Sequence, residues 1–213
     1  MAEITVEQAR ALYDGNDSVH AFDHILRVTR LAEHIAEMEG ADRRVVRTAG
    51  LLHDIARLEP DHHLAGAQRA QDLLEDENPA FVDAVVHCIE SHRFSTPPHP
   101  ETIEAKCLCD ADKLDAIGAI GIARVFGYAG HHNNRLWTAP LAELREEVGP
   151  NRRAYRAQWG GSSDYSPSHE LLCKLECLAE GMHTATARRT AAQRHAFMLD
   201  FFARLDEEAL GRM

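Results

Sequence analysis

The chain has 213 residues, of which 45% are hydrophobic, and this is enough for one sizeable globular domain. Its formal net charge of −11 disfavours a non-specific grip on nucleic acid, because such binding needs clustered Lys and Arg. Stable nucleic-acid binding is therefore not expected. No apolar run reaches the length of about eighteen residues that a membrane span requires. The first residues lack a basic segment followed by an apolar one, so we expect an unsecreted, cytoplasmic protein.

The cysteine content fits a reducing compartment. The five Cys residues form no Cys-x-x-Cys pair, so we expect reduced and mostly buried thiols. Cys107 and Cys109 are separated by one residue, which is poor spacing for a zinc site. The 14 His residues are a high number, and many of them lie between His20 and His99. Metal chemistry is therefore sought in that part of the chain.

The first half of the chain carries signals for helices joined by short turns. Residues typical of helix starts open several of them: Thr5 in a capping box, Asp42, and Asn78 followed by Pro79. Gly40 is a good residue to end the second helix. The predicted helices cover 5–13, 20–39, 42–54, 61–74, 78–92 and 102–118.

The second half is predicted to contain longer loops. A helical pattern continues over 120–126, and helices are predicted over 168–178 and 184–205. The Gly-rich stretches 127–140 and 149–167 are interpreted as loops. Without any strand pattern, the fold class is all-α, a single-domain helical bundle.

The third predicted helix ends in the doublet His53-Asp54. Apolar residues recur at helical spacing before it, so one face of this helix should be buried. Buried His and Asp side chains are costly unless a partner binds them, and a divalent metal is one such partner. The second helix offers His24 and the sixth offers Asp112. Each has an ordinary alternative: an exposed doublet, a hydrogen-bonded buried His, or an Asp in a surface salt bridge.

Three segments together resemble the HD-domain metal-dependent phosphohydrolase superfamily. They are 19–28 (VHAFDHILRV), 50–55 (GLLHDI) and 110–118 (DADKLDAIG). The following segment 119–126 (AIGIARVF) is similar to the small bacterial YpgQ/YedJ-like group, and 194–198 matches it more weakly. The resemblance covers about residues 17–128. It implies a core over 17–128, with an N-terminal helix before it (1–16) and C-terminal loops and helices that pack on it (129–213).

The resemblance implies that His24, His53, Asp54 and Asp112 are metal ligands. Asp112 is chosen over Asp110 because the ligand of this superfamily lies in an Ala-Asp-x-Leu context. The implied cofactor is a divalent ion, with Mn favoured over Mg, Co, Ni, Zn or Fe.

Some HD proteins hold two metals, with His ligands from the two helices after the doublet. His62 and His92 lie in the corresponding places, and His63 and His87 compete for the same roles. The alternatives are that these His side chains line the pocket and contact phosphate, or are simply exposed.

Several nearby residues are candidates for catalysis beyond the ligands. Asp115 shares a helix face with Asp112 and could orient the attacking water or accept its proton. It could equally be a helix charge without a catalytic part. Lys113 and Arg27 are candidates for phosphate contact, with a salt bridge as the alternative for each. His92 is also expected to support turnover.

The favoured function is a metal-dependent phosphohydrolase that acts on a small phosphorylated substrate. Within the resembling group, hydrolysis of (deoxy)nucleoside triphosphates is the natural choice. Alternatives are a nucleotidase or phosphodiesterase, a free-standing (p)ppGpp hydrolase, an HD-type di-iron oxygenase and a non-catalytic nucleotide sensor. No membrane partner is expected, and a homodimer is possible. The HD fold alone does not fix the substrate.

Overall fold

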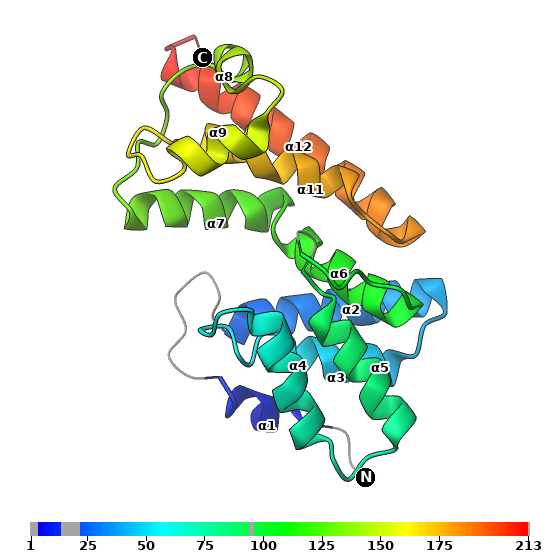
Figure 1. Ribbon diagram of the computed structural model, residues 1–213. Coiled ribbons are helices and arrows are strands. Elements are labelled where there is room, and N and C mark those ends of the chain that lie inside the picture. Colours follow the sequence, from blue (N-terminus) through cyan, green and yellow to red (C-terminus); the bar gives the residue numbers. More distant parts are fainter. Residues whose placement is uncertain (1–3, 14–21, 94–95, 213) are drawn as a thin grey trace. The chain divides into compact units, whose positions relative to one another are not determined.

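The computed structural model describes residues 4–13, 22–93 and 96–212 (Figure 1). Within these ranges the regular elements are helices and no strand occurs, which confirms the all-α prediction. The predicted start of the second helix near His20 lies outside the described residues. None of the described helices is both long enough and apolar enough to cross a membrane.

The described chain forms two compact units. The N-terminal unit contains the described residues up to Asp115 together with His183–Ala187, and the C-terminal unit contains Ala116–Met182 with the described residues from Arg188 onward. The two units divide between Asp115 and Ala116, and a family core that extends to 128 stays a prediction. Each unit is described by itself.

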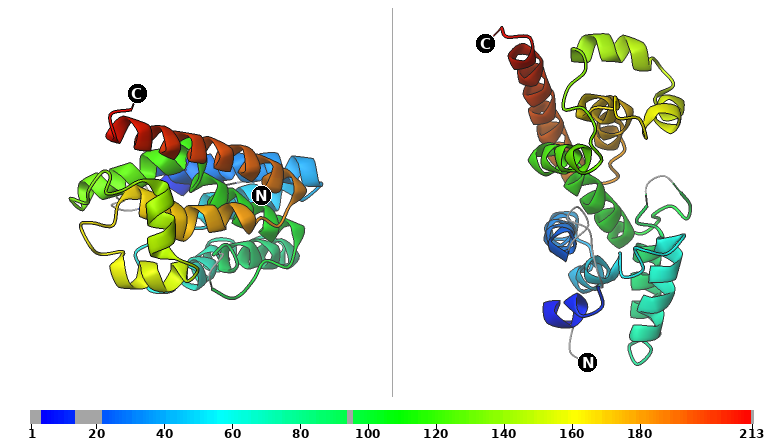
Figure 2. Two further views of the ribbon diagram at one scale, coloured as in Figure 1. Left: turned by 90° about the horizontal axis from the view of Figure 1, so that it is seen from above. Right: turned by 90° about the vertical axis from the view of Figure 1, so that its left-hand side faces the viewer.

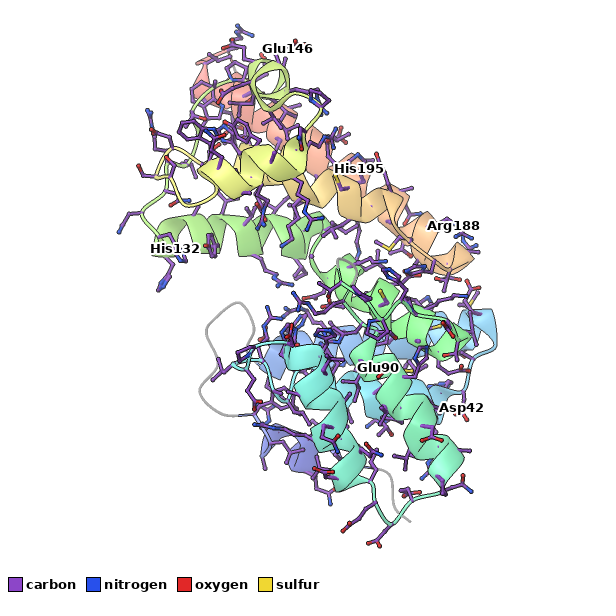
Figure 3. The ribbon with its side chains drawn as sticks, viewed as in Figure 1. Asp42, Glu90, His132, Glu146, Arg188 and His195 are labelled. Atoms are coloured by element: carbon purple, nitrogen blue, oxygen red, sulfur yellow. The ribbon has the colours of Figure 1, made fainter. Side chains whose placement is uncertain are left out.

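The N-terminal unit consists mainly of six helices that begin close to where the sequence predicted them. They are α1 (Val6–Arg10), α2 (Phe22–Glu39), α3 (Arg43–Leu52), α4 (His62–Leu73), α5 (Pro79–Glu90) and α6 (Ile103–Asp115). The Thr5 capping box is formed, Asp42 caps α3 and Asn78 caps α5. Asp42 is labelled at the start of α3 in Figure 3. Local capping chemistry thus fixes where these helices begin.

The core of this unit lies where α2 packs against α3 and α6, while α4 pairs with α5 (Figure 2). Ile25, Leu52 and Leu108 are fully buried there. Burial of each such side chain contributes roughly 1.5–3 kcal/mol. A Cβ at Gly50 would lie 2.9 Å from Thr29 Oγ1 of α2, so only glycine permits this close approach. The approach brings the end of α3 next to α2.

The first turn of the last helix also belongs to the N-terminal unit. Asp110 of α6 is fully buried and accepts hydrogen bonds from the backbone N–H groups of His183 and Thr184 and from the Thr184 hydroxyl. Glu39 accepts a hydrogen bond from the backbone N–H of Thr186. These carboxylates satisfy N–H groups that the start of a helix leaves without an intrahelical partner.

The C-terminal unit contains the remaining helices. They are α7 (Gly118–His131), α8 (Leu141–Val148), α9 (Arg152–Trp159), α10 (Pro167–Glu170), the π-helical turn η1 (Leu171–Leu175), α11 (Glu176–Glu180) and all but the first turn of α12 (Ala185–Ala209). Helix α12 ends four residues beyond the predicted limit at 205, at Ala209.

Two loop predictions in this unit were wrong. Helix α7 continues to His131, because the buried Ala129 packs against the unit despite Gly127 and Gly130. The stretch predicted as a loop over 149–167 contains α9, which Asn151 caps. Ion pairs from α9 to Glu176 and Glu170 hold this helix, and such tertiary contacts leave no mark in the local sequence pattern.

Candidate metal centre

Side chains from α2, from the end of α3 and from α6 converge inside the N-terminal unit. The ligand atoms of His24, His53 and Asp112 all lie within 4.8 Å of one another. Asp54 Oδ2 lies 3.9 Å from Nε2 of both His24 and His53. We call these three residues with Asp54 Oδ2 the first half-site. The structure thus brings together the four residues that the sequence assigned as metal ligands.

A second group of ligand atoms shares Asp54. Its other carboxylate oxygen, Oδ1, lies 3.6 Å from His62 Nε2 and 3.7 Å from His92 Nε2. We call His62, His92 and Asp54 Oδ1 the second half-site. His62 begins α4 and His92 follows the end of α5, so these ligands come from the two helices after the doublet.

The imidazole rings are held with Nε2 turned to the cluster. His53 Nδ1 donates to the carbonyl of Gly50 at 2.8 Å, and His92 Nδ1 donates to the carbonyl of Ile89 at 2.6 Å. His24 Nδ1 donates to the Asp115 carboxylate at 2.7 Å. With Nδ1 carrying the proton, the lone pair of each Nε2 is available to a metal ion, a pattern common to histidine ligands.

The residues present fit a divalent ion. His53 Nε2 and Asp54 Oδ1 are buried and have no hydrogen-bond partner, although buried polar atoms are almost always paired. His24 Nε2 lies 3.5 Å from Asp112 Oδ1. Donors bound to one ion at about 2.0–2.2 Å lie roughly 3–3.5 Å apart, so small movements complete the coordination. Imidazole and carboxylate donors suit several divalent metals.

The electrostatics favour the protonation states that metal binding needs. Burial lowers the pKa of both His53 and His62 to about 4, so both rings are neutral near pH 7. Burial by itself would raise the pKa of Asp54, but the surrounding His residues and Arg57 hold that pKa well below its usual range. The pKa of Asp112 is likewise lowered, against the effect of burial, by His24 and His53. Neutral His and ionised Asp are the forms that bind metal.

Asp115 lies behind His24 and does not face open solvent. Its side chain is 3% exposed, and both oxygens are engaged: one by His24 and Arg27, the other by Arg27 at 2.7 Å. Burial acts to raise the pKa of Asp115, but hydrogen bonds from His24 and Arg27 lower it. The geometry suits a positioning residue that orients His24 more than the water-activating role expected from the sequence. Arg27 forms ion pairs with both Asp115 and Asp23, which is the salt-bridge alternative considered for it, so we do not propose it as a phosphate contact.

Other candidates from the sequence lie outside the two half-sites. Lys113 is 3% exposed with Nζ 3.7 Å from Asp110, so we do not propose it as a phosphate contact. His63 is buried, which lowers its pKa, and it is hydrogen-bonded to the backbone of Pro97. His87 lies 3.2 Å from Glu90, which Figure 3 labels on α5, and accepts a hydrogen bond from the Glu101 backbone.

One residue of the centre received no role from the sequence. Arg57, three positions after Asp54, places Nη1 3.1 Å from His62 Nε2 and 3.7 Å from Asp54 Oδ1. The only available signal was its place shortly after the doublet, which does not show that its side chain turns back toward the ligands.

Comparisons with known proteins agree with this geometry. The HD domain family model matches residues 21–117. The YpgQ protein of Bacillus subtilis is 33% identical over 212 residues, covering 95% of this chain and 90% of that protein.

Solved structures extend the likeness to the fold. The structure of B. subtilis YpgQ in complex with ADP matches with a TM-score of 0.70 at 31% identity, covering 95% of this chain and 92% of that one. An HD-superfamily hydrolase from Bacillus thuringiensis matches with a TM-score of 0.72 at 29% identity, covering 95% and 93%. A ligand cluster built around His53-Asp54, together with a relative aligned along nearly the whole chain, places this protein in the HD-domain family.

Proposed function

We propose that this protein is a metal-dependent phosphohydrolase that converts a nucleoside triphosphate and water into a nucleoside monophosphate and pyrophosphate. The observation that carries the proposal is the convergence of the ligand atoms of His24, His53 and Asp112, within 4.8 Å of one another, around a buried His53 Nε2 that has no hydrogen-bond partner. The ADP complex of YpgQ supports a nucleotide as the substrate class.

In this proposal His24, His53, Asp54 and Asp112 hold the ion. A bound divalent ion lowers the pKa of a water molecule toward neutrality and draws charge from a phosphoryl oxygen. The chain itself supplies the orientation. Asp115 fixes the ring of His24, the carbonyl of Gly50 fixes that of His53, and burial keeps His24, His53 and Asp54 away from bulk water. Asp112 is the most accessible ligand, with its side chain 30% exposed, so substrate approaches from its side.

His92 and His62 form the remaining wall of the centre. Together with Asp54 Oδ1 they form a second set of donors. In the proposal this set either binds a further ion or faces the phosphate group that water attacks. In the reaction water adds to phosphorus, the bond from the α-phosphorus to the bridging oxygen breaks, and pyrophosphate leaves. The proton lost by the water passes to solvent or to the leaving group.

The test combines metal content with product analysis. Protein purified without chelator is analysed for metals and then assayed on a panel of nucleoside tri-, di- and monophosphates with added Mn²⁺. We expect pyrophosphate from triphosphates, loss of activity with EDTA and recovery with Mn²⁺. The Asp112→Asn variant should lose metal and activity, whereas Asp83→Asn, at an exposed position on α5, should retain both.

Other products would contradict the proposal in distinct ways. Release of inorganic phosphate from monophosphates would identify a nucleotidase. Cleavage of (p)ppGpp alone would identify a different substrate. Two irons per chain without hydrolysis would identify an oxygenase, and nucleotide binding without turnover would identify a sensor.

A further inference from the structure

The second half-site contains a cation from the chain itself. Arg57 Nη1 lies 3.1 Å from His62 Nε2. A guanidinium group can only donate hydrogen bonds, so His62 Nε2 must accept with its lone pair. A metal ion would need that same lone pair. Arg57 and an ion therefore cannot use His62 at the same time.

The charge balance points the same way. The second half-site has two His donors and one carboxylate, and Asp54 shares that carboxylate with the first half-site. Asp112, the other carboxylate of the cluster, belongs to the first half-site. Arg57 Nη1 lies 3.7 Å from Asp54 Oδ1, so a second divalent ion would meet a positive charge at close range. Repulsion at such distances is strong wherever water is partly excluded.

The Arg57 side chain has space to move away from the second half-site. It follows α3 in a non-helical turn, and its side chain is 35% exposed. With Asp54 and Glu59 it borders a hollow of about 180 Å³. Rotation of this side chain would not disturb a helix.

We propose that Arg57 is an internal cation of the second half-site, which makes the protein bind one divalent ion tightly and a second only weakly. The proposal rests on the metal centre described above and adds to it a residue that sets the number of bound ions. Because Arg57 can move aside, the second ion is excluded by competition and not by shape.

The experiment counts Mn²⁺ ions bound to the full-length protein in the absence of nucleotide, by calorimetry and by the electron paramagnetic resonance signal of free Mn²⁺. The wild-type protein should bind one ion tightly. In Arg57→Ala the dissociation constant of a second ion should fall at least about tenfold. In Arg57→Lys the positive charge remains, so the second ion should still bind weakly.

Controls separate this proposal from the proposed function. Arg30→Ala makes the same charge change at an exposed position of α2, and the affinities for both ions should equal those of the wild type. Arg57→Ala combined with His92→Ala should lose the second ion again. Circular dichroism establishes that every variant is folded.

Two results would overturn the role of Arg57. One is a wild-type protein that already binds two ions with similar affinity. The other is an Arg57→Ala variant whose second ion is unchanged or survives removal of His92. A wild-type protein that binds no ion would instead overturn the metal centre itself, and with it the proposed function.

Discussion

The two half-sites share one carboxylate but differ in how their remaining groups are held. In the first, Asp115 orients His24 and a backbone carbonyl orients His53, and both rings are buried. In the second, His92 is fixed in the same way, whereas His62 is partly exposed and its Nε2 accepts a hydrogen bond from Arg57. Donors fixed in advance cost less to order when a ligand binds. The first half-site is therefore ready for an ion, and the second must first release its own cation.

Loss of Asp54 should abolish metal binding at both half-sites, and with it the difference between them, because each half-site uses one of its carboxylate oxygens. In Asp54→Asn we expect loss of bound metal and a fall in turnover of about a thousandfold or more, the scale seen when a group on which a whole site depends is removed. Metal analysis and turnover on the same sample measure it. Full activity with unchanged metal content would refute the assignment.

The pH dependence of the metal-free protein tests whether both half-sites start with neutral rings. Burial lowers the pKa of His53 to about 4 from an ordinary value near 6.5, so between these values the unfolded chain binds more protons than the folded one. The free energy of unfolding should therefore fall as the pH drops from about 6.5 to 4, by at most roughly 3–4 kcal/mol for this residue.

Urea unfolding in EDTA at several pH values measures this loss. His53→Asn and His62→Asn should each flatten the pH dependence, because both rings have a pKa of about 4. The exposed His34 provides the control, and His34→Asn should leave the slope unchanged. An equally steep slope in all three variants would show that these rings are not the source.

Asp115 should matter only to the first half-site. Asp115→Asn removes the charge that holds His24 while preserving the shape of the side chain. The affinity for the first ion should fall about 10–100-fold, as for other groups that orient a metal-binding His. Calorimetry with Mn²⁺ measures it. Asp23→Asn removes the other acidic partner of Arg27 and should change the affinity far less.

His92 should have the smallest effect on the first ion. We expect His92→Asn to lower turnover about tenfold, the lower end for a residue that supports a metal site without binding the ion, while the first ion remains bound. His34→Asn again serves as the control. Loss of the first ion in His92→Asn would mean that the two half-sites are not separable.

The sequence predicted the N-terminal unit better than the C-terminal one for a physical reason. Capping residues such as Asp42 and Asn78 act on their own neighbours, so they can be recognised locally. The four proposed ligands were recognisable because a family motif spaces them along the chain, on α2, at the end of α3 and on α6. Helix α9 has a local cap too, Asn151, but this residue lies in a stretch whose Gly and Pro residues predicted a loop, and its ion pairs to Glu176 and Glu170 lie outside the local pattern.

The same distinction applies within the centre. The positions of His24 and Asp115 are far apart in sequence, and only the packing of α2 against α6 shows that one orients the other. Arg57 is close to Asp54 in sequence, but a turn after α3 can direct its side chain either way. Side-chain direction in turns depends on tertiary contacts, so its role had to come from the structure.

The buried carboxylate of Asp110 shows that the N-terminal unit is not a continuous stretch of sequence. The family match ends at 117, yet Asp110 takes hydrogen bonds from His183 and Thr184, far along the chain. A fragment cut after 117 would retain every ligand of the metal centre but leave this charge buried without its amide partners, at a cost of a few kcal/mol. The stretch of chain that carries the proposed ligands is thus shorter than the stretch that satisfies the buried groups around them.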